Sequence, residues 1–199
     1  MIDRRELLMG IGGIVGMFAV GGIAYAVDPP ERDALLRPPG GQYEKFAGLC
    51  IKCDRCRTVC PLGCVSFSGL EDGLISARTP VMDFHKGYCD FCNKCIEACP
   101  TGALRAFDPA MEKIGIAVID TEACIAYERA GCTQCFDICE YDAIVVEQGS
   151  FPKIINDRCN GCGECVYVCP SNVYGAFRGS FNRAVEVVAI QEVSNREDR

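Results

Sequence analysis

Three observations predict an α+β fold built from four similar units that are rich in cysteine loops. Seventeen of the 199 residues are cysteine, a density at which a small chain is usually ordered by disulfides or bound metal. Sixteen of them form four groups of four, which begin at residues 50, 89, 124 and 159. Short apolar, strand-like runs lie between the groups. A repeat of this size indicates supersecondary units stacked along the chain.

The first segment, residues 1–26, has the features of an export signal. Arg4 and Arg5 precede an apolar run, and the tripeptide AYA at 24–26 forms an A-x-A cleavage site, as in a twin-arginine signal. The run at 7–26 is also about twenty residues long, enough for a helix to span a bilayer. We therefore expect a signal or a membrane anchor, and an uncleaved signal can be both.

Residues 27–49 follow as a proline-rich segment. Its two Pro-Pro pairs, at 29–30 and 38–39, favour extended backbone. We expect this segment to be a stiff tether between the first segment and the cysteine groups.

The four cysteine groups share one spacing. Groups one, two and four read C-x-x-C-x-x-C-x-x-x-C-P, whereas in group three the first interval has grown to seven residues and Glu140 replaces the proline. The candidate ligands are Cys50, Cys53, Cys56, Cys60, Cys89, Cys92, Cys95, Cys99, Cys124, Cys132, Cys135, Cys139, Cys159, Cys162, Cys165 and Cys169.

This spacing predicts iron–sulfur clusters. Three thiolates three residues apart on a turning loop can reach three corners of one cube, and in two-cluster ferredoxins the fourth cysteine ligates the other cluster. Structural zinc normally takes two separated C-x-x-C or C-x-x-H pairs, and the odd cysteine count with near-identical repeats disfavours disulfides. We expect four 4Fe-4S clusters in two pairs, with a 3Fe-4S cluster as the alternative at the stretched third group.

The runs around the cysteine groups complete two ferredoxin-like βαβ units within residues 50–190. Each unit reads as cysteine loop, helical turn, strand, turn and strand. Strands are expected after the first three groups, before the later ones and at the end of the region, followed by a polar tail at 191–199. The expected strand segments are 64–67, 73–77 with 81–84, 103–107, 114–120, 143–147, 151–157 and 184–190.

One cysteine, Cys64, stands outside the four groups. When the groups are aligned on their last cysteine, its position holds Ala103, Ala143 and Val173 in the other three. Because free cysteine packs as a small hydrophobic residue, we interpret Cys64 as core packing beside the first cluster and expect Cys64→Ala to keep all four clusters.

Several motifs resemble the exported ferredoxin-type proteins of the NapG and MauM family. They are LRPPG at 36–40, the nearby Phe46, CIKCDRC at 50–56 and CTQCFDIC in the stretched group at 132–139. The order of intact, intact, stretched and intact groups is also similar, and the resemblance covers essentially the whole chain. It implies that all sixteen cysteines are ligands in an exported four-cluster protein, associated with periplasmic nitrate reductase or with methylamine oxidation.

The even spacing leaves the pairing of the groups open between a sequential and a nested arrangement. A resemblance to the four-cluster electron-transfer subunits of molybdenum oxidoreductases favours nesting, with an outer unit of 50–82 and 156–190 around an inner unit at 83–155. Nesting implies that Cys169 joins Cys50, Cys53 and Cys56, that Cys60 joins Cys159, Cys162 and Cys165, that Cys99 joins Cys124, Cys132 and Cys135, and that Cys139 joins Cys89, Cys92 and Cys95.

The sequence indicates an electron carrier rather than an enzyme with its own substrate site. It has no G-x-G-x-x-G, G-x-S-x-G or phosphate loop, and its single histidine, His85, is expected to be structural or at the surface. A net charge of −7 argues against a nucleic-acid partner and suits docking onto a basic patch. Arg57, where the other groups carry apolar residues, marks either a docking face or a solvated position.

Compartment and partners follow from the clusters and the first segment. Clusters are built in a reducing cytoplasm, so export in the folded state through a twin-arginine signal is consistent. We expect a protein on the periplasmic side of the inner membrane, soluble or anchored. It would relay electrons from a membrane quinol-oxidising iron–sulfur protein to a periplasmic acceptor, a cytochrome or a molybdenum reductase. The alternatives are an electron-transfer subunit of a molybdenum oxidoreductase and a maturation or assembly ferredoxin with structural clusters.

Overall fold

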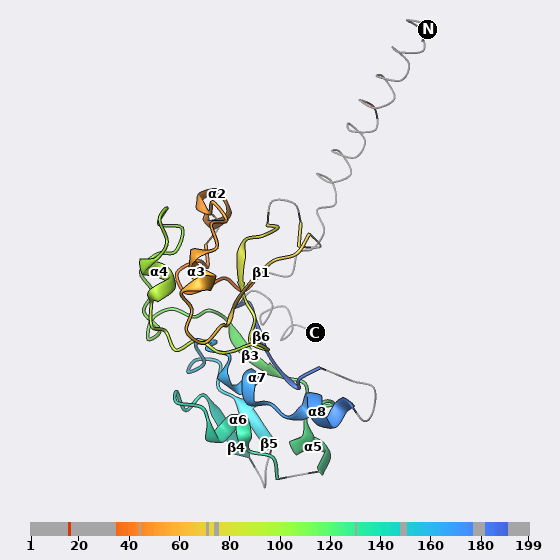
Figure 1. Cartoon of the computed structure of the whole chain (residues 1–199). Helices are drawn as coiled ribbons and strands as arrows, with labels where there is room; N and C mark the ends of the chain where they lie inside the picture. The colour runs from red at the N-terminus through yellow and green to blue at the C-terminus, as the bar shows by residue number, and fades with distance from the viewer. Residues whose placement is uncertain are drawn as a thin grey trace, which may run out of the picture. The chain divides into compact units, whose positions relative to one another are not determined.

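The computed structural model in Figure 1 describes residue 16 and residues 35–190, except 44, 71, 74–75, 130, 148–150 and 177–181. Contacts divide the chain into Met1–Asp33 and Ala34–Arg199, and every helix and strand below belongs to the second unit. No helix of the described residues is long and apolar enough to cross a membrane. Apart from residue 16, the predicted signal or anchor at 1–26 lies outside the described residues.

The first half of this unit combines one-turn helices with a hairpin. The elements are α2 (Phe46–Leu49), α3 (Arg55–Thr58), β1 (Val65–Phe67), β2 (Pro80–Met82) and α4 (Lys94–Glu97). β1 and β2 pair antiparallel, with Val65 opposite Met82. The third cysteines of groups one and two lie on α3 and α4, and these two helices pack against each other (Figure 1).

The second half contains a complete two-group unit. Its elements are β3 (Ile116–Ile119), α5 (Ile125–Arg129), α6 (Gln134–Asp137), β4 (Ile144–Glu147), β5 (Phe151–Ile154), α7 (Glu164–Val168), α8 (Ser171–Ala176) and β6 (Val185–Val188). β4 and β5 form an antiparallel hairpin between groups three and four. β3 precedes group three, β6 follows group four, and the two strands pair antiparallel. This closes a strand, loop, hairpin, loop, strand unit, as expected for a ferredoxin-like fold.

The core runs through both halves and includes cysteines as well as hydrocarbon side chains. Phe46, Phe84 and Val166 are each 5% exposed or less, and Cys56 and Cys165 are buried in the same core. Thiols therefore occupy interior positions that a larger domain would fill with aliphatic side chains.

The prediction that residues 27–49 form a tether is wrong for the described part of this segment, because residues 35–43 and 45–49 pack onto the fold. Pro38 and Pro39 are fully buried. The guanidinium of Arg37 lies 5.1 Å from the centre of the Phe46 ring and donates a 3.2 Å hydrogen bond to the Pro80 carbonyl. Proline has an apolar ring and no backbone N–H that needs an acceptor, so it can line a core when a neighbouring side chain donates to the carbonyls nearby.

The strand expected at 103–107 is also absent from the described structure. Its backbone meets the N-terminal segment instead, since the Arg105 N–H donates to the Gly40 carbonyl over 3.1 Å. Gly40 has φ +76°, and a Cβ there would lie 2.0 Å from the Arg105 carbonyl oxygen. In the first half, the turn at Gly40 therefore packs against residues 103–107, at the position where the second half has the β3–β6 pair. No ladder of strand hydrogen bonds forms there.

Candidate metal centres

Four cysteines from groups one and two surround one cavity. Cys50 and Cys53 lie on the loop before α3, Cys56 lies on α3, and Cys99 follows the end of α4. Burial raises the pKa of Cys56 to about 11, with contributions from charge on Cys50 and Cys53. We call these four cysteines set 1.

The remaining cysteines of groups one and two form set 2, which consists of Cys60, Cys89, Cys92 and Cys95. Burial raises the pKa of Cys95 to about 12, and charges on Cys89, Cys56 and Cys92 raise it further. Cys60 and Cys89 are connected through Cys64, whose sulfur contacts both. Because charge on Cys56 of set 1 contributes to the raised pKa of Cys95 of set 2, these two sets are neighbours.

Groups three and four are divided in the same way. Cys124, Cys132 and Cys135 gather with Cys169 as set 3: Cys132 and Cys169 pack around Cys124 in a small second core. Burial raises the pKa of Cys135 to about 12, together with charges on Cys124, Cys169 and Cys132.

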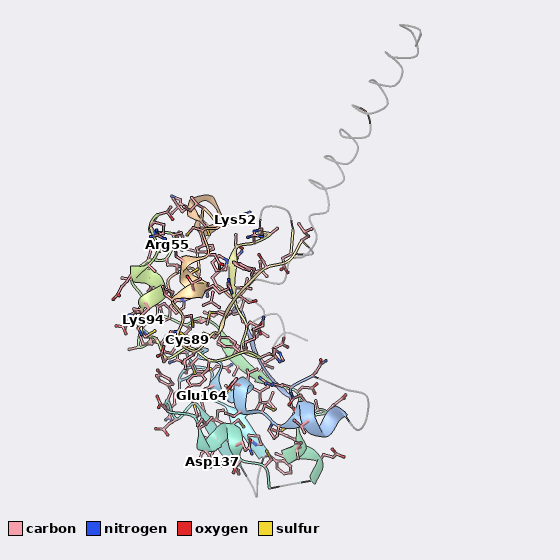
Figure 2. All side chains as sticks on the ribbon, viewed as in Figure 1. Lys52, Arg55, Cys89, Lys94, Asp137 and Glu164 are labelled. Atoms are coloured by element: carbon pink, nitrogen blue, oxygen red, sulfur yellow. The ribbon has the colours of Figure 1, made fainter. Side chains whose placement is uncertain are left out.

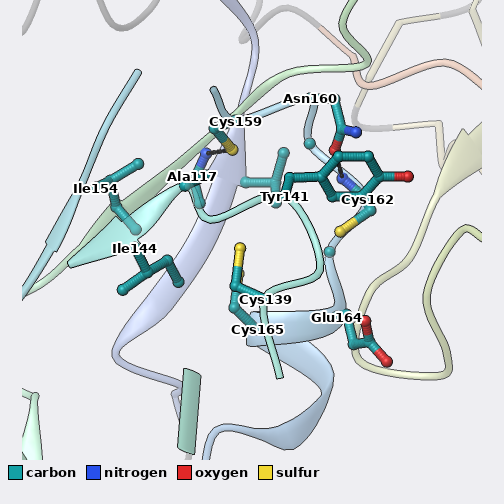
Figure 3. Close-up of a pocket in the computed structure, with 14 residues that line it drawn as sticks. Ala117, Cys139, Tyr141, Ile144, Ile154, Cys159, Asn160, Cys162, Glu164 and Cys165 are labelled. Carbon is teal, nitrogen blue, oxygen red and sulfur yellow. Dashed lines mark hydrogen bonds between the residues drawn. The ribbon is translucent and has the colours of Figure 1, made fainter. Parts of the chain in front are cut away.

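Set 4 consists of Cys139, Cys159, Cys162 and Cys165, which line a second cavity (Figure 3). The backbone N–H of Ala117 on β3 donates a 3.4 Å hydrogen bond to the Cys159 sulfur. Burial raises the pKa of Cys162 to about 12 and that of Cys165 well above its usual value; charge on Cys135 adds to the second shift. Sets 3 and 4 are therefore neighbours, as sets 1 and 2 are.

These sets correct the nested pairing. Cys99, expected with Cys124, lies with Cys50, and Cys169, expected with Cys50, lies with Cys124. The physical cause is the strand pairing, since each hairpin joins two consecutive groups and α6 packs against α7 as α3 packs against α4. All sixteen candidate cysteines are thus gathered in fours, and the sequential arrangement, the other one that the spacing left open, describes the fold.

The cysteine loops turn through left-handed backbone. The residue before the second cysteine has a positive φ in every group: Lys52 (56°), Phe91 (53°), Gly131 (93°) and Gly161 (78°). The residue after it is left-handed in groups one, two and four, at Asp54, Asn93 and Gly163, whereas Thr133 in the stretched group has φ −123°. Alternation of right- and left-handed residues points successive N–H groups inward, which makes a concavity suited to an anionic cluster.

The donor chemistry fits the same interpretation. A single zinc needs thiolates that converge to about 2.3 Å from one point, whereas in a 4Fe-4S cluster each thiolate binds a different iron. Four thiols around a cavity, within loops that direct N–H groups inward, are a donor set for a cluster.

Sets 2 and 4 meet where the two halves of the fold join. The Cys89 N–H donates to the Cys162 carbonyl over 2.8 Å. The Phe91 ring lies edge-on to Tyr141, with ring centres 6.1 Å apart, and charges on Cys162 and Cys89 both contribute, after burial, to raising the pKa of Tyr141. With sets 1 and 3 at the outer positions, the order through the molecule is set 1, set 2, set 4, set 3.

Sequence reasoning missed Phe91 and Tyr141. Phe91 occupies a loop position that holds Lys52 in group one and glycine in groups three and four, and its ring also stacks on Phe107 with centres 5.7 Å apart. A large aromatic residue at a position otherwise held by glycine or a solvated side chain was the available signal.

Two single residues noted in the sequence, His85 and Arg57, lie at the surface. His85 is exposed, as expected, and its backbone N–H donates to the Asp83 carboxylate. Arg57 forms a two-pronged ion pair with Asp54, with N to O distances of 2.7 and 2.8 Å. Since Asp54 is left-handed, this pair helps to hold the first cysteine loop in its turn.

Comparisons with known proteins agree with this geometry. Two family models, both described as a 4Fe-4S dicluster domain, match the chain, one at residues 117–174 and the other at 49–103 and 88–143. The matches at 49–103 and 117–174 each span two groups whose cysteines share sets in the structure, and the match at 88–143 spans groups two and three. Fold and site thus define an iron–sulfur protein of the dicluster ferredoxin class.

The relatives narrow the class. The Ferredoxin-type protein NapG of Escherichia coli is 31% identical over 188 residues, covering 83% of this chain and 80% of the relative. The shorter Ferredoxin-type protein NapF of the same organism is 31% identical over 140 residues, with 68% and 80% coverage. A chain of a formate dehydrogenase, heterodisulfide reductase and formylmethanofuran dehydrogenase complex from Methanospirillum hungatei is 20% identical, covering 72% of this chain and 50% of its own, with a TM-score of 0.27. The chain belongs to the NapG-type ferredoxin family.

Proposed function

We propose that this protein is a four-cluster electron relay on the periplasmic side of the inner membrane, between a membrane quinol-oxidising module and a periplasmic redox acceptor. The observation that carries the proposal is the continuous order of the four cysteine sets, with outer sets at the two ends and sets 2 and 4 in contact. Each set would hold one 4Fe-4S cluster, which when bound accepts and releases a single electron.

The chain's own residues position this relay. The cysteine thiolates fix each centre within its loops, and the Cys89 to Cys162 hydrogen bond holds sets 2 and 4 together. The buried Phe91 ring packs edge-on against Tyr141 between the two loops, and apolar packing there lowers the local dielectric through which charge would move.

The two ends differ in charge. Helix α3 beside set 1 carries Arg55 and Arg57, of which Arg57 is paired with Asp54 at the start of the helix, and the nearby Ile51 is 63% exposed. Helix α6 beside set 3 carries Asp137 and no base. Figure 2 shows Arg55 on the first half and Asp137 on the second. This asymmetry supports two partners of different surface charge, an acidic one at set 1 and a basic one at set 3.

The periplasmic location of the protein is tested by altering the predicted signal at residues 1–26. Replacing both Arg4 and Arg5 with lysine keeps the charge but removes the twin-arginine pair. Accumulation of the folded, iron-loaded variant in the cytoplasm supports export through that signal, and unchanged fractionation contradicts it.

The relay is tested with the tagged protein, purified anaerobically from detergent-solubilised membranes. Co-purification of a polytopic membrane protein with its own cysteine motifs, together with cluster reduction by added quinol, supports the proposal. Cys92→Ala should interrupt transfer from quinol to set 3 while partner binding is retained, and His85→Ala serves as the control. Recovery only with a soluble catalytic subunit, and no reduction by quinol, would favour the subunit or assembly alternatives.

A further inference from the structure

The thiol of Cys64 lies inside set 2. Its side chain is 1% exposed, its sulfur is 3.6 Å from the Cys60 sulfur, and it lies beside the Cys89 thiol. The burial predicted from the sequence is therefore confirmed, but a contact with two candidate ligands of the same set is more than packing requires.

The chemistry of the contact fixes the direction of the hydrogen bond. When Cys60 and Cys89 bind iron they are thiolates and can only accept. A third buried thiolate next to them would be repelled by both and would have no counter-ion. Cys64 therefore stays protonated, and its S–H group is the donor.

Of the two central sets, 2 and 4, only set 2 has a side-chain donor in contact with the sulfur of its group's last cysteine among the described residues. At the outer sets, a hydroxyl lies two residues after the last cysteine: Thr101 is 3.8 Å from the Cys99 sulfur and Ser171 is 3.1 Å from the Cys169 sulfur. The matching positions after Cys60 and Cys139 hold Leu62 and Tyr141. Four residues after the last cysteine, set 4 has Ala143, which is 2% exposed and offers no donor.

Hydrogen bonds to cluster sulfurs are one of the factors that set reduction potential. They stabilise the more negative, reduced form, so a donor raises the potential. We propose that Cys64 is a positioning residue whose S–H group hydrogen-bonds the Cys60 or Cys89 thiolate and raises the potential of the set 2 cluster relative to that of set 4. The inference rests on the proposed function in that set 2 must hold a 4Fe-4S cluster.

The test is an anaerobic redox titration of the full chain, followed by low-temperature EPR. The set 2 signal is identified as the one lost or converted in Cys92→Ala. In Cys64→Ala we expect wild-type iron content, a lower midpoint for the set 2 signal and unchanged midpoints for the other three. Cys64→Ser keeps an O–H donor in a smaller side chain and should show a smaller shift.

The matched control is Ala143→Cys, which places a thiol at the equivalent position of set 4 and should raise that midpoint. An unchanged set 2 midpoint in Cys64→Ala, with all iron retained, would mean that Cys64 only packs. Loss of one cluster in both Cys64 variants would make Cys64 a ligand and overturn the inference. Iron content of the wild-type protein below four clusters would instead contradict the proposed function, independently of Cys64.

Discussion

The backbone N–H of Cys89 donates a 2.8 Å hydrogen bond to the carbonyl of Cys162, and this bond links the two halves of the fold. Cys89 is the first cysteine of group two and Cys162 the second cysteine of group four. Side-chain substitution leaves both backbone groups in place, so variants of the cysteines themselves can report on ligand sets while the junction persists.

The sequential sets make a prediction about pairs of cysteine variants. Cys50→Ala and Cys99→Ala should each remove or convert the same cluster, and the double variant should lose no more than one. The pair Cys99→Ala and Cys124→Ala should lose two clusters, because these cysteines belong to sets 1 and 3. Iron analysis and EPR decide this; the reverse pattern would restore the nested arrangement.

Substitution of Gly163 should disturb set 4 more than its backbone angle alone would explain. A Cβ at Gly163 would lie 2.0 Å from the Phe84 ring, and φ there is +80°. We expect Gly163→Ala to cost about 1–3 kcal/mol from overpacking, beyond the strain of a left-handed alanine.

Gly102→Ala is the control, since φ is +65° and no atom lies within 4 Å of the added Cβ. The midpoint of thermal unfolding, followed anaerobically by cluster absorbance, compares the two. Equal losses in the two variants would show that Phe84 yields without cost.

Arg37 is predicted to fasten the N-terminal segment to the fold. Its guanidinium donates to the Pro80 carbonyl and the Thr79 hydroxyl and covers Phe46. Removing a charged donor from buried acceptors costs about 1.5–3 kcal/mol, so Arg37→Ala should lower the unfolding midpoint and expose residues 35–49 to protease. The exposed Arg55→Ala is the control, and an equally small effect in both would count against this role.

Retention of iron should depend on pH. Burial raises the pKa of Cys56 to about 11 and those of Cys95 and Cys162 to about 12, so without iron these thiols hold their protons at neutral pH. A raised pKa means that the proton competes with iron below that value, and competition weakens as pH rises. Loss of clusters to a chelator should therefore slow between pH 6.5 and 8.5. A rate that is constant across this range would refute the prediction.

Reversal of charge at set 1 should slow association with a partner that docks there. Arg55 is exposed on α3, close to the exposed Ile51. For a partner with an acidic face, Arg55→Glu should reduce the association rate constant by about tenfold at low salt, with a smaller effect at high salt. Glu122→Lys, near set 3, is the matched reversal and should leave that rate unchanged. The rate of cluster reduction after stopped-flow mixing with the purified partner measures association for both variants.

The sequence predicted the composition of the site better than its arrangement. Every one of the sixteen cysteines lies in a set of four, because the spacing within a loop is a local property that the C-x-x-C-x-x-C pattern encodes. Which set Cys99 or Cys169 joins depends on tertiary contacts, namely the packing of α3 against α4 and of α6 against α7 and the hairpins that join consecutive groups. Nearly equal distances between the groups carry no information on that pairing.

The N-terminal segment illustrates a second limit. Pro38 and Pro39 favour extended backbone wherever they occur, and a tether or a packed strap satisfies that preference equally well. Burial was decided by the contact between Gly40 and Arg105 and by the side chain of Arg37, which are tertiary interactions without a local sequence pattern.

The left-handed residues of the cysteine loops bear on the order in which the protein matures. In the first two loops these positions are held by Lys52, Asp54, Phe91 and Asn93; the steric cost is roughly 1–2 kcal/mol for Lys52 and Phe91 and smaller for Asp54 and Asn93. In the fourth loop they are Gly161 and Gly163, which carry no such cost.

An iron-free chain therefore adopts the native turn of the fourth loop more often than those of the first two. We expect iron to enter set 4 first during anaerobic reconstitution and the outer set 1 later. EPR of freeze-quenched samples, with each signal assigned through the cysteine variants, would resolve this order. Simultaneous loading of the two sets would disprove it. Maturation of the protein would then proceed from its last-synthesised loop toward its first.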